Sequence, residues 1–342
     1  MRTGNVILIL SASFLLSSSF FPALGVSNAV RMPSDVVYQN YNIDGESASI
    51  IFISRNMSST SPSLDANNYE FINYSRYDKF GVLKIYPTKD GGREWYMNES
   101  DPRSDPNFIY DAKIRKQPNG VWRVSGEQLS ENLKGQVRME VNTSEGEEEW
   151  KNVEITGYAR VVETTGRTPS AESDLENSFQ WYARGGRHDN EVPCDGTSLK
   201  GRLHLNGKAS WVKEIWHTGG YTKEKSKEKV TPHLVKEQDT EGHYRDGRWF
   251  GLKVIIYNVN NDKAVRMETF LDERLDNRWI KVNSLEDKGQ WYSNRSDFYD
   301  VDCGRPRNYI VSNSGPMVGF RTDYVIWEFK DLSIREIDPF KQ

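Results

Sequence analysis

The stretch that decides the fold runs from Leu199 to Trp216 and reads LKGRLHLNGKASWVKEIW. Apolar and polar residues alternate on both sides of Asn206-Gly207, and this period of two is typical of strands with one buried face. Asn-Gly is a strong signal for a two-residue hairpin loop, because both residues tolerate a positive φ. The stretch therefore predicts a β-hairpin with one apolar and one polar face.

A two-residue loop at Asn206-Gly207 fixes which side chains of the hairpin share a face. It places Arg202 opposite Trp211 and Lys200 opposite Lys213. The predicted polar face carries Lys200, Arg202, His204, Trp211, Lys213 and His217. The predicted core face carries Leu199, Leu203, Leu205 and Val212. In the preceding strand, Gln180, Tyr182 and Arg184 share one face.

Similar short runs of alternating residues extend on both sides of this hairpin. Examples are Val153 to Val161, Gly251 to Tyr257 and Val325 to Phe329, and Gly, Asn, Asp and Pro separate the runs. Heptads, sustained helical periodicity and internal repeats are absent from the sequence. A dozen short strands with turn signals between them predict an all-β sandwich with little helix.

Composition excludes several classes of protein. Of the 342 residues, 36% are hydrophobic, 12% aromatic and 27% charged, which is too apolar for a disordered chain. Lys and Arg number 45 against 49 Asp and Glu, for a net charge of -4. No block of like charge resembles a nucleic-acid-binding arm, so we expect no nucleic-acid partner.

The N-terminus predicts export. Arg2 precedes an apolar, Ser-rich stretch from Val6 to Gly25, and small residues follow up to Ala29. This order is typical of a cleaved signal peptide over residues 1–29, with a retained membrane anchor as the alternative. No other stretch is long and apolar enough to span a membrane. The predicted location is therefore outside the cell or at its surface.

The rest of the chain divides into an arm and a domain. Residues 30–64 are rich in Ser and Asn and poorly patterned, which indicates a flexible N-terminal arm. Residues 65–337 hold the predicted strands and are expected to form a single β-sandwich domain. The linker-like Thr164 to Ser170 leaves a second domain boundary open, although neither half alone gives a closed set of strands.

Two further features agree with an oxidising compartment. Cys194 and Cys303 are the only cysteines, and without metal-ligand spacing they predict a disulfide. Asn-x-Ser sequons, at which an exported chain becomes a glycoprotein, occur at Asn56, Asn73, Asn98, Asn142 and Asn294.

The basic face of the hairpin suggests a ligand. Arginine forks bind carboxylates in bidentate geometry, and an exposed aromatic ring packs on the apolar face of a sugar. We therefore predict that an acidic polysaccharide or other glycan binds a concave sheet face through Arg184, Arg202, His204, Trp211 and Lys213. The alternative is a solvated outer face whose long side chains cover apolar surface.

Motifs for other chemistry are absent. The five histidines show neither HxH nor HExxH spacing, so no metal site is predicted, and a structural calcium stays open. The sequence has no nucleophile elbow, P-loop or dinucleotide fingerprint, and we expect no cofactor. Strand carboxylates such as Glu140, Glu154, Glu214 and Glu268 lack the E-x-D-x-E spacing of sandwich glucanases.

The order of segments from Phe108 to Ile337 resembles the concanavalin A-like jelly rolls of lectins, glucanases and polysaccharide lyases. The resemblance rests on Trp150 to Tyr158, Gly247 to Tyr257 with the strand that follows it, and Asp331 to Glu336. It covers about two-thirds of the chain and implies a jelly-roll sandwich.

Among enzymes, the nearest resemblance is to polysaccharide lyases of the alginate-lyase type. Arg138-Met-Glu140 is similar to part of their R-x-E-L-R strand, and Glu214-Ile-Trp-His217 is similar to their Q-I-H strand. Their late Y-F-K-A-G-V-Y strand should fall near Met317 to Thr322, which lacks the tyrosine.

The lyase resemblance implies β-elimination on an acidic polysaccharide. Arg138 or Arg321 would neutralise the uronate carboxylate, Glu214 would orient the substrate and His217 would act as the base. A non-catalytic carbohydrate-binding or cell-surface module and a glycoside hydrolase remain the alternatives.

Overall fold

The structure is a computed structural model, which describes residues 26–31, 36–43, 46–54, 69–70, 76–124, 136–164, 177–186, 196–215, 229–230, 244, 247–291, 305–306, 308–323 and 325–341. The chain forms two compact units, Met1–Lys84 and Ile85–Gln342. In the first unit, β1 (Val26–Arg31), β2 (Val36–Ile43), β3 (Glu46–Ser54) and β4 (Tyr69–Glu70) form a four-stranded antiparallel sheet. Strands β2 and β3 lie where the sequence indicated an arm. The predicted limits of signal, arm and sandwich remain predictions.

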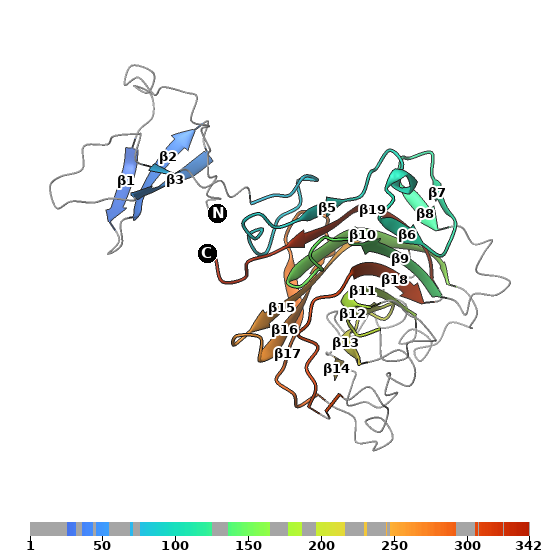
Figure 1. Ribbon diagram of the computed structural model, residues 1–342. Helices are drawn as coiled ribbons and strands as arrows, with labels where there is room; N and C mark the ends of the chain where they lie inside the picture. The colour runs from blue at the N-terminus through green and yellow to red at the C-terminus, as the bar shows by residue number, and fades with distance from the viewer. Residues whose placement is uncertain are drawn as a thin grey trace. The chain divides into compact units, whose positions relative to one another are not determined.

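The second unit consists of two antiparallel sheets, whose curved strands are visible in Figure 1. The eight-stranded sheet has the order β17 (Ile280–Asp287), β16 (Ala264–Asp272), β15 (Phe250–Val259), β10 (Val153–Thr164), β19 (Val325–Glu336), β8 (Trp122–Val124) and β7 (Ile114–Lys116), with β5 (Glu94–Tyr96) paired to β19. The seven-stranded sheet has the order β14 (Lys229–Val230), β13 (Ala209–Glu214), β12 (Ser198–His204), β11 (Ser178–Gly185), β18 (Met317–Asp323), β9 (Gln136–Asn142) and β6 (Phe108–Tyr110). The described residues contain no α-helix, so the predicted all-β sandwich is confirmed.

The core lies between the two sheets and is rich in aromatic rings. Trp181 of β11 packs edge-on against Phe320 of β18, with ring centroids 5.5 Å apart. Phe179 packs in the same way against Trp327 of the other sheet, at 5.4 Å. Edge-to-face ring pairs stabilise a core beyond the effect of the area that they bury. The pair of Phe179 and Trp327 thus joins the two sheets.

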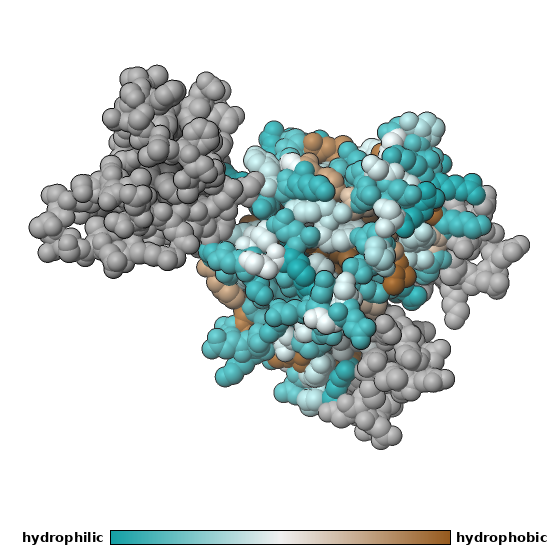
Figure 2. Space-filling view, turned by 45° about the horizontal axis from the view of Figure 1, so that its top comes forward, coloured by the Kyte–Doolittle hydropathy of each residue, from teal (hydrophilic) through white to brown (hydrophobic). Residues whose placement is uncertain are grey.

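The surface is mainly polar. Figure 2 shows hydrophilic residues over most of the described surface on the side drawn, with small and separate apolar areas between them. Scattered apolar side chains of this kind are normal for a folded domain. The described residues include no long apolar helix of the kind that crosses a lipid bilayer.

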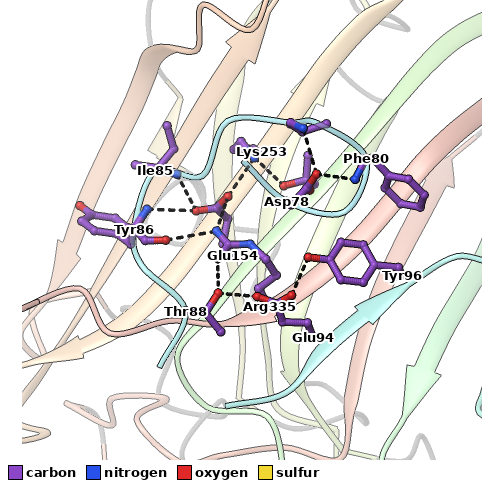
Figure 3. Close-up of polar contacts among 12 residues, drawn as sticks. Asp78, Phe80, Ile85, Tyr86, Thr88, Glu94, Tyr96, Glu154, Lys253 and Arg335 are labelled. Atoms are coloured by element: carbon purple, nitrogen blue, oxygen red, sulfur yellow. Dashed lines mark hydrogen bonds and ion pairs between the residues drawn. The ribbon is translucent and has the colours of Figure 1, made fainter. Parts of the chain in front are cut away.

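The face of the eight-stranded sheet that points away from the core, here called the back face, holds a buried ion cluster (Figure 3). Glu154 of β10 is fully buried, and its Oε1 lies 2.8 Å from Lys253 Nζ and 2.9 Å from an Arg335 nitrogen. Its Oε2 accepts hydrogen bonds from the backbone N–H groups of Ile85 and Tyr86, at 3.1 and 3.3 Å. The carboxylate thus holds the start of the second unit against the sheet.

The charges of this cluster set the protonation of Glu154. Burial alone would raise the pKa of Glu154, but Arg335 and Lys253 lower it to about 2. Arg335 also donates to Thr88 Oγ1 at 2.9 Å and to the Tyr86 carbonyl at 3.2 Å. The folded pKa therefore lies below that of the unfolded chain, so the carboxylate stabilises the fold at neutral pH and this stabilisation is lost at low pH.

Replacing the carboxylate tests this role. Glu154→Gln keeps the size of the side chain but leaves Lys253 and Arg335 buried without a counter-ion. We expect the free energy of unfolding to fall by about 3–5 kcal/mol in urea titrations at neutral pH. The difference between wild type and variant should shrink as the pH falls from about 4 toward 2, because Glu154 takes up a proton first in the unfolded chain and only near pH 2 in the folded protein.

Glu147→Gln is the matched control for this substitution. Glu147 is exposed and lies 3.8 Å from Arg93 NH1. Exposed ion pairs stabilise proteins by at most about 1 kcal/mol, so this variant should unfold almost as the wild type does. Equal effects of the two substitutions would contradict the role of Glu154.

Candidate functional site

The loop of the central hairpin has three residues rather than the predicted two. The His204 N–H donates to the Lys208 carbonyl at 2.8 Å, which leaves Leu205, Asn206 and Gly207 in the loop. Gly207 has a φ of +83° and its N–H donates to the His204 carbonyl at 2.9 Å. This is the geometry of a type I turn followed by a left-handed glycine. The extra loop residue shifts the register of β13 by one.

The shift sends Trp211 into the core, which corrects the prediction of an exposed aromatic. Trp211 pairs with Gly201 and is fully buried. A Cβ on Gly201 would lie 3.0 Å from the indole and 2.6 Å from Val254 of the other sheet, so this pair faces inward. A one-residue slip moves every side chain of a strand to the opposite face. Trp211 is therefore a core residue and no platform for a sugar.

Lys213 turns inward for the same reason, so its predicted place on the polar face is corrected. Its ammonium lies 2.7 Å from Asp287 Oδ2 and donates to the carbonyls of Trp291, at 3.2 Å, and Tyr309. Burial lowers the pKa of Lys213, and Asp287 acts in the opposite direction. The lysine thus joins β13 to the end of β17 across the sandwich.

Arg184 is also structural. The register of β11 shifts at Arg184, whose φ is +62°, so it leaves the face of Gln180 and Tyr182. Its buried guanidinium donates to the carbonyls of Val311, at 2.6 Å, and Lys151, at 3.0 Å. A bulge cannot be foreseen from alternation alone, and the predicted place of Arg184 on the face of Gln180 and Tyr182 is corrected.

The face of the seven-stranded sheet that points away from the core, here called the front face, collects the remaining predicted residues. Strand register places Arg138, Arg321, Gln180 and Arg202 directly opposite one another on β9, β18, β11 and β12. We call these four residues the front row. Adjacent strands lie about 4.8 Å apart, so three arginines span about 14 Å of sheet.

Two of the front-row arginines each form an ion pair with a carboxylate of the same chain. Arg321 donates from Nε to Asp323 Oδ1 at 2.7 Å, and Gln180 donates to the same carboxylate at 2.6 Å. Arg138 is more open, since its side chain is 32% exposed and lies 3.9 Å from Asp111. Like charges directly opposite each other destabilise a sheet, so these carboxylates offset the repulsion between the arginines.

Beside the front row lies a tyrosine that the sequence did not single out as a site residue. The Tyr182 hydroxyl donates to Glu140 on β9, across β18. A Cβ on Gly319 of β18 would lie 2.4 Å from Tyr182 Cζ, so the ring lies flat over that glycine. Burial raises the pKa of Tyr182 well above its ordinary value, Glu140 raises it further, and Arg138 and Arg321 act in the opposite direction. The phenol is therefore a proton donor at neutral pH.

The part of the front face on β12 and β13 is mostly buried. Glu214 is fully buried, accepts from Ser198 Oγ at 2.8 Å and lies 3.0 Å from Lys200 Nζ. His204 is buried too, and its Nε2 lies 2.7 Å from Ser210 Oγ. Glu214 and His204 thus lie on the predicted face, but both are buried there. The open part of the face is that of Arg138, Glu140 and Arg202, each partly exposed.

Other predicted residues lie outside the part of the chain that the structure describes. They are His217, proposed as the base, and the cysteines Cys194 and Cys303. Within the described ranges, no group of three or more His, Cys, Asp and Glu side chains could hold a metal ion.

Comparison with known proteins finds likeness in structure alone, since no family model and no curated protein matches the sequence. Peanut lectin, solved with a 9mer peptide, matches with 8% identity and a TM-score of 0.38, over 71% of this chain and 96% of the lectin. Lectin I from Ulex europaeus, solved with the methyl glycoside of α-L-fucose, matches with 8% identity and a TM-score of 0.38, over 71% of this chain and 97% of the lectin. The binding domain of botulinum neurotoxin DC, in complex with SialylT, matches with 9% identity and a TM-score of 0.35, over 77% of this chain and 47% of the neurotoxin chain. The function is therefore argued from this chain's own residues.

The placement of Trp211 changes the expected effect of removing it. Trp211→Ala should lower the free energy of unfolding by about 3–5 kcal/mol, because it leaves a cavity between the sheets. Denaturant unfolding followed by circular dichroism measures this loss. Phe340→Ala removes an aromatic ring that is 68% exposed and should have little effect. If Trp211→Ala were as stable as the wild type, Trp211 would be exposed and the two-residue loop would be supported instead.

Proposed function

We propose that this chain is an exported protein that binds an acidic polysaccharide on its front face. The observation that carries the proposal is the front row, in which three arginines and Gln180 lie side by side across four strands. Guanidinium groups match carboxylates in bidentate geometry, and an amide adds a donor for a sugar hydroxyl. A row of such groups suits a polymer that repeats its carboxylates.

The aromatic part of the sequence hypothesis changes in this proposal. Trp211 is in the core, and the ring of Tyr182 is buried against Gly319, so neither stacks on a sugar. Binding on the front face would rest on charge-assisted hydrogen bonds. Such contacts weaken with added salt, and affinity should therefore depend on ionic strength.

Export is part of the proposal. It is supported by the signal-like residues 1–29, the sequons and the use of only two cysteines. An acidic polysaccharide is a ligand found outside the cell or at its surface, which agrees with the predicted location.

Cleavage of the bound polymer by β-elimination is a second candidate. It is favoured by the pair of Tyr182 and Glu140 beside Arg138 and Arg321. An arginine would neutralise the uronate carboxylate, and a base would take the C5 proton. The electron pair would then form the C4–C5 double bond as the C4–O bond breaks, and Tyr182 would protonate the departing oxygen.

Two predicted catalytic roles change or stay open in this scheme. Glu214 is bound to Ser198 and Lys200 and would position that lysine rather than touch the substrate. His217 remains the predicted base. A glycosidase receives no comparable support, because Glu140 and Asp323 already accept hydrogen bonds from Tyr182 and Arg321.

Binding is tested on Arg138, a partly exposed arginine of the front row. Arg138→Gln should weaken binding of a galacturonate oligomer by roughly tenfold or more in calorimetry, the scale of a lost charge-assisted contact. Arg278→Gln is the matched control, because Arg278 is 76% exposed and ion-paired with Asp276 elsewhere on the surface. Unchanged affinity in both Arg138→Gln and Arg321→Gln would remove the front face as the site.

Cleavage is tested on Tyr182. Tyr182→Phe keeps the ring over Gly319 and removes the hydroxyl. If wild type converts polyuronate to a product with ultraviolet absorbance, the variant should lose roughly 100-fold in kcat with little change in KM. Binding without any unsaturated product from wild type would make the chain a non-catalytic module.

A further inference from the structure

The back face carries a second group of cations and rings, separate from the front row and from the Glu154 cluster. Strand register places Arg123 of β8, Glu328 of β19 and Arg160 of β10 opposite one another. In the next row, Lys330 of β19 lies opposite Tyr158 of β10. All five side chains alternate with residues of the core and therefore share the outer side of the sheet.

The charges in these rows do not balance. Glu328 accepts from Arg123 Nε at 2.9 Å and from Arg160 Nε at 2.6 Å, so one carboxylate serves two guanidinium groups. Lys330 adds a third cation and is ion-paired with Asp331 at 3.7 Å, so three cations share two carboxylates. The patch therefore has an excess of positive charge.

Two cations of this patch are open to solvent. The two terminal nitrogens of Arg160 and the ammonium of Lys330 make no hydrogen bond to another residue of the described ranges. Both side chains are partly exposed, at 32% and 39%. Cations with unused donors beside apolar surface are suited to an anion that brings its own oxygens.

The apolar surface beside them is aromatic. Arg160 Cζ lies 5.3 Å and Lys330 Nζ 5.6 Å from the ring of Trp249, which precedes β15 and is only partly buried. Lys330 Nζ also lies 5.5 Å from the ring of Tyr158. Two cations thus lie over one indole ring.

A glycine lets the rings lie close to the sheet. Gly251 pairs with Tyr158, and a Cβ there would lie 2.6 Å from Trp279 Cη2 and 2.9 Å from Tyr158 Cε1. The rings of Tyr158 and Trp279 have centroids 5.9 Å apart. Any other residue at Gly251 would push these rings outward, so the glycine keeps them close to the sheet.

We infer that this back-face patch, formed by Arg160, Trp249, Lys330 and Tyr158, is a second binding site for an anionic sugar unit. The indole of Trp249 packs against the apolar face of the sugar ring, and the carboxylate accepts from Arg160 and Lys330. The inference goes beyond the proposed function, because it uses no front-row residue. With sites on both outer faces, one molecule bridges two polysaccharide chains.

Calorimetry of the full chain with a galacturonate oligomer tests this site. Wild type should show two binding events. Trp249→Ala and Lys330→Glu should each abolish one of them or weaken it by roughly tenfold or more, as for a hot-spot anchor. Arg138→Gln should abolish the other event or weaken it by roughly tenfold or more. Phe340→Ala, which removes an exposed ring elsewhere, should keep both. Lys330→Glu lies on the surface and keeps the measurement valid if Trp249→Ala does not fold.

The outcomes separate the two sites. A single event that Arg138→Gln removes would overturn the back-face site and leave the proposed function intact. A single event that Trp249→Ala removes would overturn the front-face function and support the back-face site. If wild type instead binds anionic lipid vesicles through Trp249 and no oligomer there, the sugar assignment is overturned. Turbidity with long polyuronate, lost in Trp249→Ala, would support bridging.

Discussion

In an antiparallel hairpin, the number of loop residues fixes which side chains of the returning strand face the core. Here the loop from Leu205 to Gly207 sets the register of β13, so Trp211 and Lys213 point inward and Glu214 points outward. With a loop one residue shorter, a buried indole and a buried ion pair would become surface groups. The composition of both the core and the front face thus depends on this loop.

The inward turn of a lysine needs an acid to receive it. Lys213 lies 2.7 Å from Asp287 inside the sandwich, and the back face holds the buried cluster of Glu154, Lys253 and Arg335. Buried ion pairs stabilise a fold less than apolar packing does, but removing one partner lowers stability strongly because the other charge stays buried without a counter-ion. Such pairs penalise any alternative register, because a slip would leave charges without partners. They help to explain how one hairpin can hold a three-residue loop against a strong two-residue signal.

Alternation predicts the class of the fold and the faces of single strands well, since both follow from a period of two. It placed Arg202 and His204 on the front face correctly, because they precede the loop in β12. It failed for Trp211 and Lys213 after the loop and for Arg184 at a bulge. Loop length and bulges are set by hydrogen bonds that the sequence pattern does not encode.

Tyr182 shows a further limit of prediction from a single strand. Its residue type and face are readable from the sequence, but its contact with Glu140 depends on Gly319 in a strand far along the chain. Trp249 and Arg160 come together in the same way, through the pairing of β10 with β15. Sites that cross several strands are therefore hidden until the strand order is known.

The two outer faces differ in how their cations are neutralised. On the front face Arg321 holds Asp323 and Lys200 holds Glu214, so an acidic ligand must compete with carboxylates of the chain itself. On the back face Arg160 shares Glu328 with Arg123, and Lys330 lies 3.7 Å from Asp331, beside Trp249. Competition lowers affinity but makes it selective for ligands that match the spacing of several arginines at once. The proposed ligand of the front face is therefore a repeating polymer, and the proposed ligand of the back face is a single charged sugar unit.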